Sequence, residues 1–347
     1  MQSMDRKKKI FWSFFAVILA ALSIWAVVSQ SKELSLTQMM EMIRKSEPAW
    51  FICGILCMFG FIYFEGAAIL SIIKSIGYPR GQREGLIYSA SDIYFSAITP
   101  SATGGQPASA FFMVRDGIPV VKVTAVLIVN LVMYTLAILT IGVVCILAKP
   151  RLFYGFSILS KILIVFGFIA LSSLAVLFYF LLRKRKWIFF MGKKAIALLG
   201  RFHLLHDEED KTRKLARKMA DYKNCVEMMS GKYGMLIKAY LFNLAQRASQ
   251  ITVTLMMYMA TGGSAGRAGD IWVTQSFTVI GSNCIPVPGA MGVSDYLLLD
   301  GLGRFMHNDM AVTLELLSRS VSFYSCVIIS GIIVIMGYII DKSKRKY

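Results

Sequence analysis

The chain has 347 residues, of which 56% are hydrophobic and 17% charged, and its formal net charge is +18. Its apolar runs are long enough to cross a bilayer, which excludes an ordinary soluble globular protein. So large a basic excess would suit a nucleic-acid partner, but its placement along the chain indicates membrane topology instead.

Six segments are predicted to cross the membrane. Each provides the roughly 20 mainly apolar residues that about 30 Å of hydrocarbon requires. We interpret the first, which follows the basic residues at 6–9, as a retained anchor rather than a cleaved signal peptide. The second and the fifth are interrupted by single ionisable residues. The six segments are 10–31, 48–73, 123–148, 162–182, 233–260 and 320–340.

Two polar stretches rich in glycine and proline, 96–107 and 281–292, separate apolar segments about half as long as a span. A short helix, a breaker and a second short helix are typical of a re-entrant hairpin. The backbone groups that such breakers free must face protein or a wet cavity. Polar surface loops between short buried helices remain the alternative.

The order span, span, hairpin, span occurs twice, in pseudo-repeats 10–147 and 158–340. The first repeat makes an odd number of crossings, so the second begins on the opposite side of the membrane. We therefore predict an all-α polytopic membrane protein, a single membrane domain over 1–347, with about six full transmembrane helices and two re-entrant helical hairpins in an inverted repeat. Such repeats are typical of transporters whose site lies at the midplane.

Basic residues concentrate on one predicted side of the membrane. The segments assigned to the cytoplasm hold 27 of the 38 Lys and Arg, and the outer loops hold seven. This asymmetry predicts a multi-pass protein of the cytoplasmic membrane with both termini in the cytoplasm. The basic loop 183–232 is expected on that side, either as an amphipathic helix on the inner leaflet or as a solvated connector.

Charged residues inside apolar segments are the first candidates for a site because burying them in a bilayer is costly. Glu65, Asp92 and Asp295 are the acidic candidates, and Arg247 shares a polar helix face with Gln246. The guanidinium of Arg247 can donate two parallel hydrogen bonds to a phosphate. Pairing with one of the three carboxylates is the alternative, and the two arrangements could alternate.

The breaker stretches add neutral donors and freed backbone N–H groups to this candidate site. The six cysteines are interpreted as small buried hydrophobes, and the three histidines fall in loops. We therefore expect no catalytic residues, no metal and no cofactor. Glu315 and Arg319, four residues apart, are expected to neutralise each other. The remaining candidate binding residues are Thr99, Thr103, Gly104, Gly105, Gln106, Asn283, Pro286, Pro288 and Gly289.

Three motifs carry a resemblance to a known family: Thr-Pro at 99–100, Gly-Gly-Gln-Pro at 104–107, and Pro-Val-Pro-Gly-Ala-Met-Gly at 286–292 ahead of Asp295. Together they resemble the flippase-like membrane domain of lysylphosphatidylglycerol synthases, over nearly the whole chain. In two-part members of that family, a cytosolic domain transfers lysine from its tRNA to phosphatidylglycerol and the membrane domain translocates the product. Such lipids lower the negative charge of the envelope and give resistance to cationic peptides.

The chain ends at Tyr347, seven residues after the last predicted span. We therefore expect a stand-alone member of the family that lacks the aminoacyl-transferase domain, and no enzyme activity by the chain alone.

The resemblance and the polar residues together predict translocation of a phospholipid, lysylphosphatidylglycerol or a related aminoacylated lipid, across the cytoplasmic membrane. Arg247 would hold the phosphate, while Glu65, Asp92 or Asp295 would compensate a cationic headgroup. The alternatives are phosphatidylglycerol lysyltransferase activity, an accessory role beside a separate lipid-modifying enzyme, and transport of a polyprenyl-phosphate carrier. Expected partners are membrane lipids, such an enzyme and a further copy of the chain, but not nucleic acid.

Overall fold

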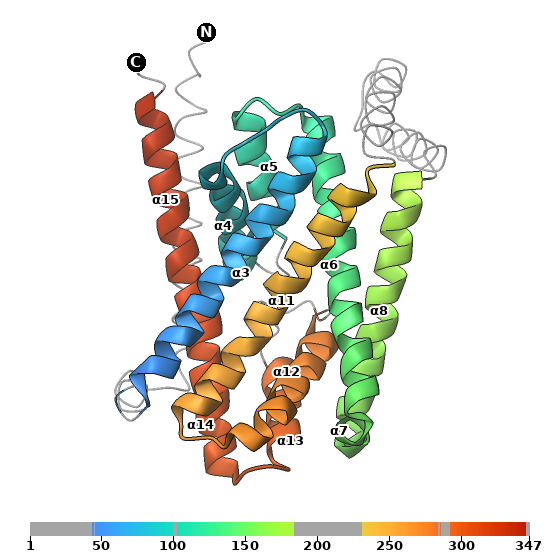
Figure 1. Ribbon diagram of the computed structural model, residues 1–347, viewed down its shortest axis with the longest axis vertical. Helices are drawn as coiled ribbons and strands as arrows, with labels where there is room; N and C mark the ends of the chain where they lie inside the picture. Colours follow the sequence, from blue (N-terminus) through green and yellow to red (C-terminus); the bar gives the residue numbers. More distant parts are fainter. Residues whose placement is uncertain are drawn as a thin grey trace, which may run out of the picture.

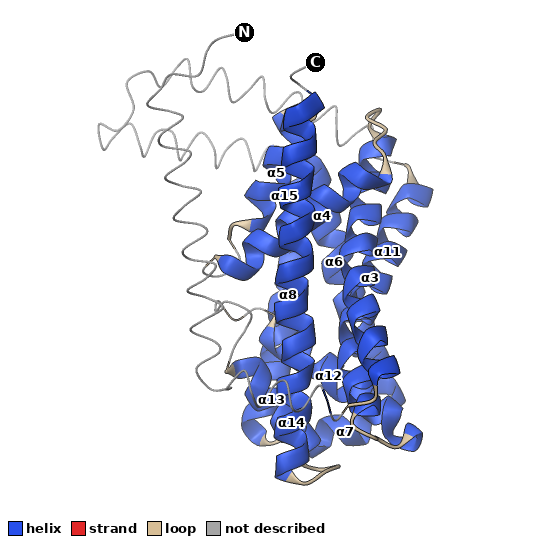
Figure 2. Cartoon of the chain, turned by 90° about the vertical axis from the view of Figure 1, so that its left-hand side faces the viewer, coloured by secondary structure: helices blue, strands red, loops and turns tan. Residues whose placement is uncertain are grey.

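The computed structural model describes residues 44, 46–99, 103–183, 231–283, 285 and 292–344. Every regular element in these ranges is helical, and Figure 2 shows helices joined by short loops. The helices are α3 (Pro48–Ser75), α4 (Gln82–Ile98), α5 (Gly105–Arg115), α6 (Val120–Ala148), α7 (Pro150–Gly155), α8 (Ile158–Arg183), α11 (Tyr233–Ala260), η3 (Ala265–Arg267), α12 (Ala268–Ser282), α13 (Val293–Leu302), α14 (Asn308–Arg319), η5 (Ser320–Ser325) and α15 (Cys326–Lys344).

Four helical stretches within the described ranges are long and apolar enough to cross a membrane: Pro48–Ser75, Val120–Ala148, Ile158–Phe180 and Asn308–Ile340. They confirm four of the six predicted spans. The last is longer than expected, because α14 and α15 continue through one π-helical segment, η5. The predicted span 10–31 and the basic loop 183–232 lie outside the described residues.

The predicted fifth span, 233–260, forms the 28-residue helix α11, but this helix is more polar than those four and does not meet the same criterion of apolarity. It lies beside α3 along most of its length (Figure 1). The two helices run antiparallel and are joined at both ends. At one end the amide N of Glu47 donates to the carbonyl of Ala260 at 2.9 Å, and at the other Lys232 donates to the carbonyl of Ser75. Packing against α3 allows α11 to keep polar residues away from lipid.

The two breaker stretches each separate a pair of short helices that pack on each other, α4 with α5 and α12 with α13. The breakers are shorter than predicted, since 96–98 still belong to α4 and 105–107 already belong to α5. Pro107 fits there because a proline in the first turn of a helix removes an N–H that has no intrahelical partner.

The two hairpins enter the molecule from opposite ends. In Figure 1, α4 and α5 occupy the upper half and α12 and α13 the lower half, and α4 and α12 both end towards the middle. The turn at the end of α3 sends α4 back down, and the turn at the end of α11 sends α12 back up.

Those two turns have the same construction. Gly77 follows α3 at φ +86° and Gly262 follows α11 at φ +81°. In each, the glycine N–H and the next N–H bond back to carbonyls of the last helical turn. This is the Schellman ending, which favours glycine because its backbone is left-handed.

Helix crossings beside the hairpins depend on glycine for a different reason, which is close approach. A Cβ on Gly66 of α3 would lie 2.6 Å from the carbonyl oxygen of Gly85 in α4. A Cβ on Gly167 of α8 would lie 2.1 Å from the carbonyl oxygen of Ile280 in α12. Small residues allow helix backbones to approach closely, which fixes the depth of each hairpin.

Candidate functional site

Three ionisable side chains are buried together where α3, α4 and α11 meet. The exposed fractions are 7% for Glu65, 6% for Asp92 and 8% for Arg247. Each comes from a different helix. Glu65 and Arg247 lie ten or more residues from either end of α3 and α11, whereas Asp92 lies in α4 close to the first breaker. The sequence predicted all three as site residues, and the structure brings them within electrostatic range of one another.

The two carboxyl groups lie within hydrogen-bonding reach of each other and are surrounded by donors. Glu65 accepts from the amide of Gln246 at 2.9 Å and lies 3.4 Å from the hydroxyl of Ser89. Asp92 accepts from the amide of Gln106 at 2.6 Å and from Ser96 at 3.3 Å. Gln106 stands in the first turn of α5, so the first breaker contributes directly to this cluster.

Arg247 is held without an ion pair in the described part of the chain. Its guanidinium carbon lies 3.9 Å from the centre of the Tyr134 ring and 5.3 Å from that of Phe61. One terminal nitrogen donates to the side-chain oxygen of Gln250, while the buried Nε has no hydrogen-bond partner. Among the described residues no carboxylate forms an ion pair with Arg247, although Glu65 and Asp92 lie within electrostatic range of it.

Tyr134 connects the arginine to the second breaker. Its hydroxyl donates to the side-chain oxygen of Asn283 at 3.0 Å, just after the end of α12. Sequence reasoning missed this residue, because a tyrosine within an apolar span is unremarkable alone. The signal in the sequence was Asn130, a polar residue one helical turn earlier in the same apolar span. In the structure its side-chain oxygen accepts a hydrogen bond from Asn243 of α11 at 3.0 Å.

The first breaker is built around Thr99 and two glycines. The Thr99 hydroxyl donates to the carbonyl of Phe95 at 2.6 Å and accepts from the amide N of Gly104 at 2.9 Å. A Cβ on Gly105 would lie 2.1 Å from a carboxyl oxygen of Asp92. Only glycine lets α5 start directly against that carboxyl group. Thr103 directly precedes this start.

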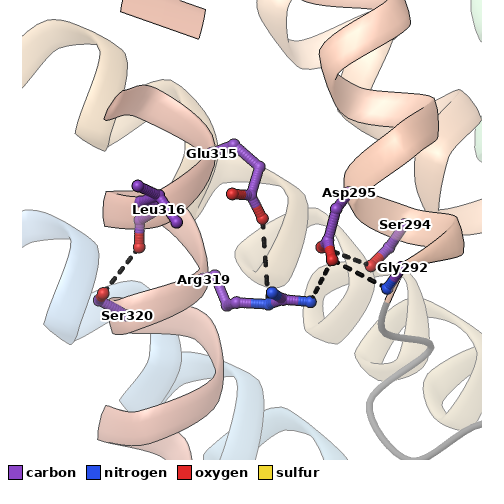
Figure 3. A network of polar contacts seen from close by, with 7 residues as sticks. All are labelled: Gly292, Ser294, Asp295, Glu315, Leu316, Arg319 and Ser320. Carbon is purple, nitrogen blue, oxygen red and sulfur yellow. Dashed lines mark hydrogen bonds and ion pairs between the residues drawn. The ribbon is translucent and has the colours of Figure 1, made fainter. Parts of the chain in front are cut away.

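Asp295 belongs to a separate network (Figure 3). It lies 2.5 Å from Arg319 of α14 and accepts from the amide N of Gly292 at 2.8 Å. Glu315 is 3.9 Å from the same arginine. The predicted pairing of Glu315 with Arg319 is thus present, but the closer partner of Arg319 is Asp295. Pro286, Pro288 and Gly289, the other predicted residues of the second breaker, lie outside the described residues.

The central cluster combines one buried guanidinium with two buried carboxyl groups. A buried guanidinium without a carboxylate partner is costly, and an anion that reaches it would recover much of that cost. Within the ranges that the structure describes, no three His, Cys, Asp or Glu residues group as metal ligands do.

Helices of this length and apolarity, interrupted by two short-helix hairpins, define an all-α polytopic membrane protein. The sequence matches the family described as Lysylphosphatidylglycerol synthase TM region over residues 13–330. The match covers most of the chain, so the protein belongs to this family, which confirms the resemblance carried by the breaker motifs. No curated protein matches the chain.

Proposed function

We propose that this protein translocates a phospholipid between membrane leaflets by passing its headgroup through the central cluster. The observation that carries the proposal is Arg247, a buried arginine without an ion pair in the described chain. It is the 15th of 28 residues in α11, about 21 Å from the start of the helix at 1.5 Å per residue. A permanent charge at such depth indicates a functional site.

The geometry suits a phosphate. Tyr134 and Phe61 orient the plane of the guanidinium, and its nitrogens present the fork that matches two phosphate oxygens. Because Asn283 holds Tyr134 and Gln106 holds Asp92, each breaker supports one part of the cluster. A headgroup bound there would contact both oppositely directed hairpins, as midplane sites of inverted-repeat transporters do.

The carboxyl groups favour a headgroup that also carries an amine. An ammonium group beside Glu65 and Asp92 would be stabilised while its phosphate binds Arg247. A headgroup with both charges paired crosses at lower cost than a bare anion. We therefore propose aminoacylated or zwitterionic phospholipids, lysylphosphatidylglycerol among them, as the substrate class. A polyprenyl phosphate, which has no amine, should be a poorer substrate.

Charge at the two ends of the described helices supports an orientation in the cytoplasmic membrane. The end at which α3 finishes carries five basic residues from the last turn of α3 to the first turn of α6, namely Lys74, Arg80, Arg83, Arg115 and Lys122. We propose that this end, where α15 also finishes, faces the cytoplasm. The first hairpin would then open to the cytoplasm and the second to the outside.

Leaflet exchange in reconstituted vesicles tests the proposal. Fluorescent phosphatidylglycerol, lysylphosphatidylglycerol and polyprenyl phosphate would be placed in separate preparations, and quenching of the outer leaflet would be followed over time. We expect exchange above that of empty vesicles, fastest for the aminoacylated lipid, and at least tenfold slower in Arg247→Gln. Lys238→Gln is the matched control, because Lys238 is an exposed cation on the same helix.

Equal exchange in Arg247→Gln and in the unaltered protein would refute this role of Arg247. No exchange of any of the three lipids would refute the proposed function itself.

A further inference from the structure

Burial of two carboxyl groups beside a single arginine favours one proton on the Glu65–Asp92 pair. Two carboxyl groups can hydrogen-bond to each other only when one of them is protonated, because ionised carboxylates have no donor. The contacts from Ser89, Ser96, Gln106 and Gln246 are all donated to the pair, so they stabilise the one negative charge that remains on it. Two negative charges side by side, both more than nine-tenths buried, would be very costly.

The charged surroundings of the pair are sparse. Helix α11 contributes Arg247 and α15 contributes the thiol of Cys326, which lies within electrostatic range of Glu65. Helix α5 offers the neutral amide of Gln106, and α6 offers Tyr134 beside the arginine. Tyr324 of η5 interacts with Arg319 and Glu315 rather than with the pair. Among the described residues, the net charge of this site is therefore set by one arginine and two carboxyl groups.

With one shared proton, the three groups sum to zero charge. A bound headgroup changes that sum, and a buried site with uncompensated charge is unfavourable. The pair can restore neutrality by binding a second proton or by releasing the one it holds, whereas the arginine cannot change its charge.

We infer that the Glu65–Asp92 pair is a proton-binding site whose occupancy follows the charge of the bound headgroup. This rests on the proposed function, in which the phosphate binds Arg247. An anionic lipid such as phosphatidylglycerol is taken up with one proton, which adds to the ionised carboxylate. A lipid with one net positive charge, such as lysylphosphatidylglycerol, displaces the shared proton to solvent. A zwitterionic lipid binds with no exchange of protons.

Linkage gives each case a distinct pH dependence. Over the pH range in which the free pair holds one proton and the complex holds two, the affinity for the anionic lipid falls about tenfold per unit rise in pH. Where the free pair holds one proton and the complex holds none, the affinity for the cationic lipid rises about tenfold per unit. Affinity for the zwitterionic lipid stays constant.

Proton exchange on lipid binding tests the inference directly. The purified chain would be titrated in weak buffer, with a pH-indicator dye, against short-chain phosphatidylglycerol, phosphatidylethanolamine and lysylphosphatidylglycerol, and the affinity of each would be measured by calorimetry. We expect uptake of about one proton for each phosphatidylglycerol bound and release of about one proton for each lysylphosphatidylglycerol. Phosphatidylethanolamine should bind without exchange of protons. The variants Glu65→Gln and Asp92→Asn should lose this exchange. Glu315→Gln, an equally buried carboxyl group outside the cluster, should keep it.

The outcomes separate the two proposals. Lipid binding with the same proton count for all three headgroups, or with none, would overturn the proton site and leave lipid translocation in place. If none of the three lipids binds, the proposed function and this inference are both overturned. Both measurements are made on the unaltered chain, so they stand even if a variant fails to fold.

Discussion

Tyr134 has two contacts that different substitutions can separate. Its ring lies under the guanidinium of Arg247, and its hydroxyl bonds to Asn283 after α12. The ring contact orients the arginine and is a cation–π interaction, worth about 2 kcal/mol where water is excluded. The hydroxyl bond adds about 1 kcal/mol and ties the second breaker to α6.

We expect Tyr134→Phe to keep most of the leaflet exchange, within about threefold, because the ring remains under Arg247. Tyr134→Leu should slow exchange about tenfold or more, since a loss of about 2 kcal/mol corresponds to more than one decade. The rate of fluorescent lipid exchange is the measurement, with folding checked by thermal unfolding in detergent. Equal rates in the two variants would mean that the ring does not orient the arginine.

At this same scale, the charged members of the cluster could be predicted and their partners could not. Glu65, Asp92 and Arg247 are conspicuous in the sequence because ionisable residues are rare in apolar spans. Which carboxylate meets which arginine depends on how the helices are rotated and stacked. Asp295 was an equal candidate for Arg247, yet the α13–α14 packing places it against Arg319.

At the scale of single elements, two helix crossings have no space for a side chain. The carbonyl oxygen of Gly85 would be 2.6 Å from a Cβ on Gly66, and backbone atoms cannot rotate away. An added methyl group must therefore push α4 off α3, and with it the carboxyl group of Asp92 away from Glu65.

We expect Gly66→Ala to destabilise the protein by about 1–3 kcal/mol, as overpacking does, and to lower its unfolding temperature in detergent. Gly234→Ala is the matched control. It lies in the first turn of α11 with nothing within 4 Å of the added Cβ, so it should leave stability equal or slightly higher. An unfolding temperature unchanged by Gly66→Ala would contradict the close approach of α3 and α4.

The elements themselves were largely predictable, because length and apolarity suffice to find a membrane helix. The boundaries of the breakers were not. Glycine and proline indicate loops by composition, but 105–107 form a helical turn because Pro107 occupies a position that needs no N–H. The π-helical segment η5 was also missed, since no residue pattern predicts one extra residue in a helical turn.

At the scale of the whole molecule, the packing repeats with opposite orientation. Helix α3 packs on α4 as α11 packs on α12, and α5 packs on α6 as α13 packs on α14. Helices α3 and α11, which end in the same glycine turn, lie against each other at the centre (Figure 1). This supports the proposed inverted repeat, although the halves share an order of elements rather than obvious sequence identity.

Such an arrangement places the ends of both breakers near one buried arginine. Asn283 reaches it through Tyr134, and the first breaker reaches its neighbours through Gln106. Movement of either hairpin would therefore change the surroundings of a headgroup bound at Arg247. The central claim is that Arg247 binds the phosphate of a membrane lipid.

The most direct test is to identify the lipid that remains bound to the purified protein by native mass spectrometry. We predict that the unaltered chain and Lys238→Gln retain a phospholipid, enriched in aminoacylated or zwitterionic headgroups relative to the membrane. Arg247→Gln should lose at least nine-tenths of it. Equal retention of the same lipid by all three proteins would contradict the account.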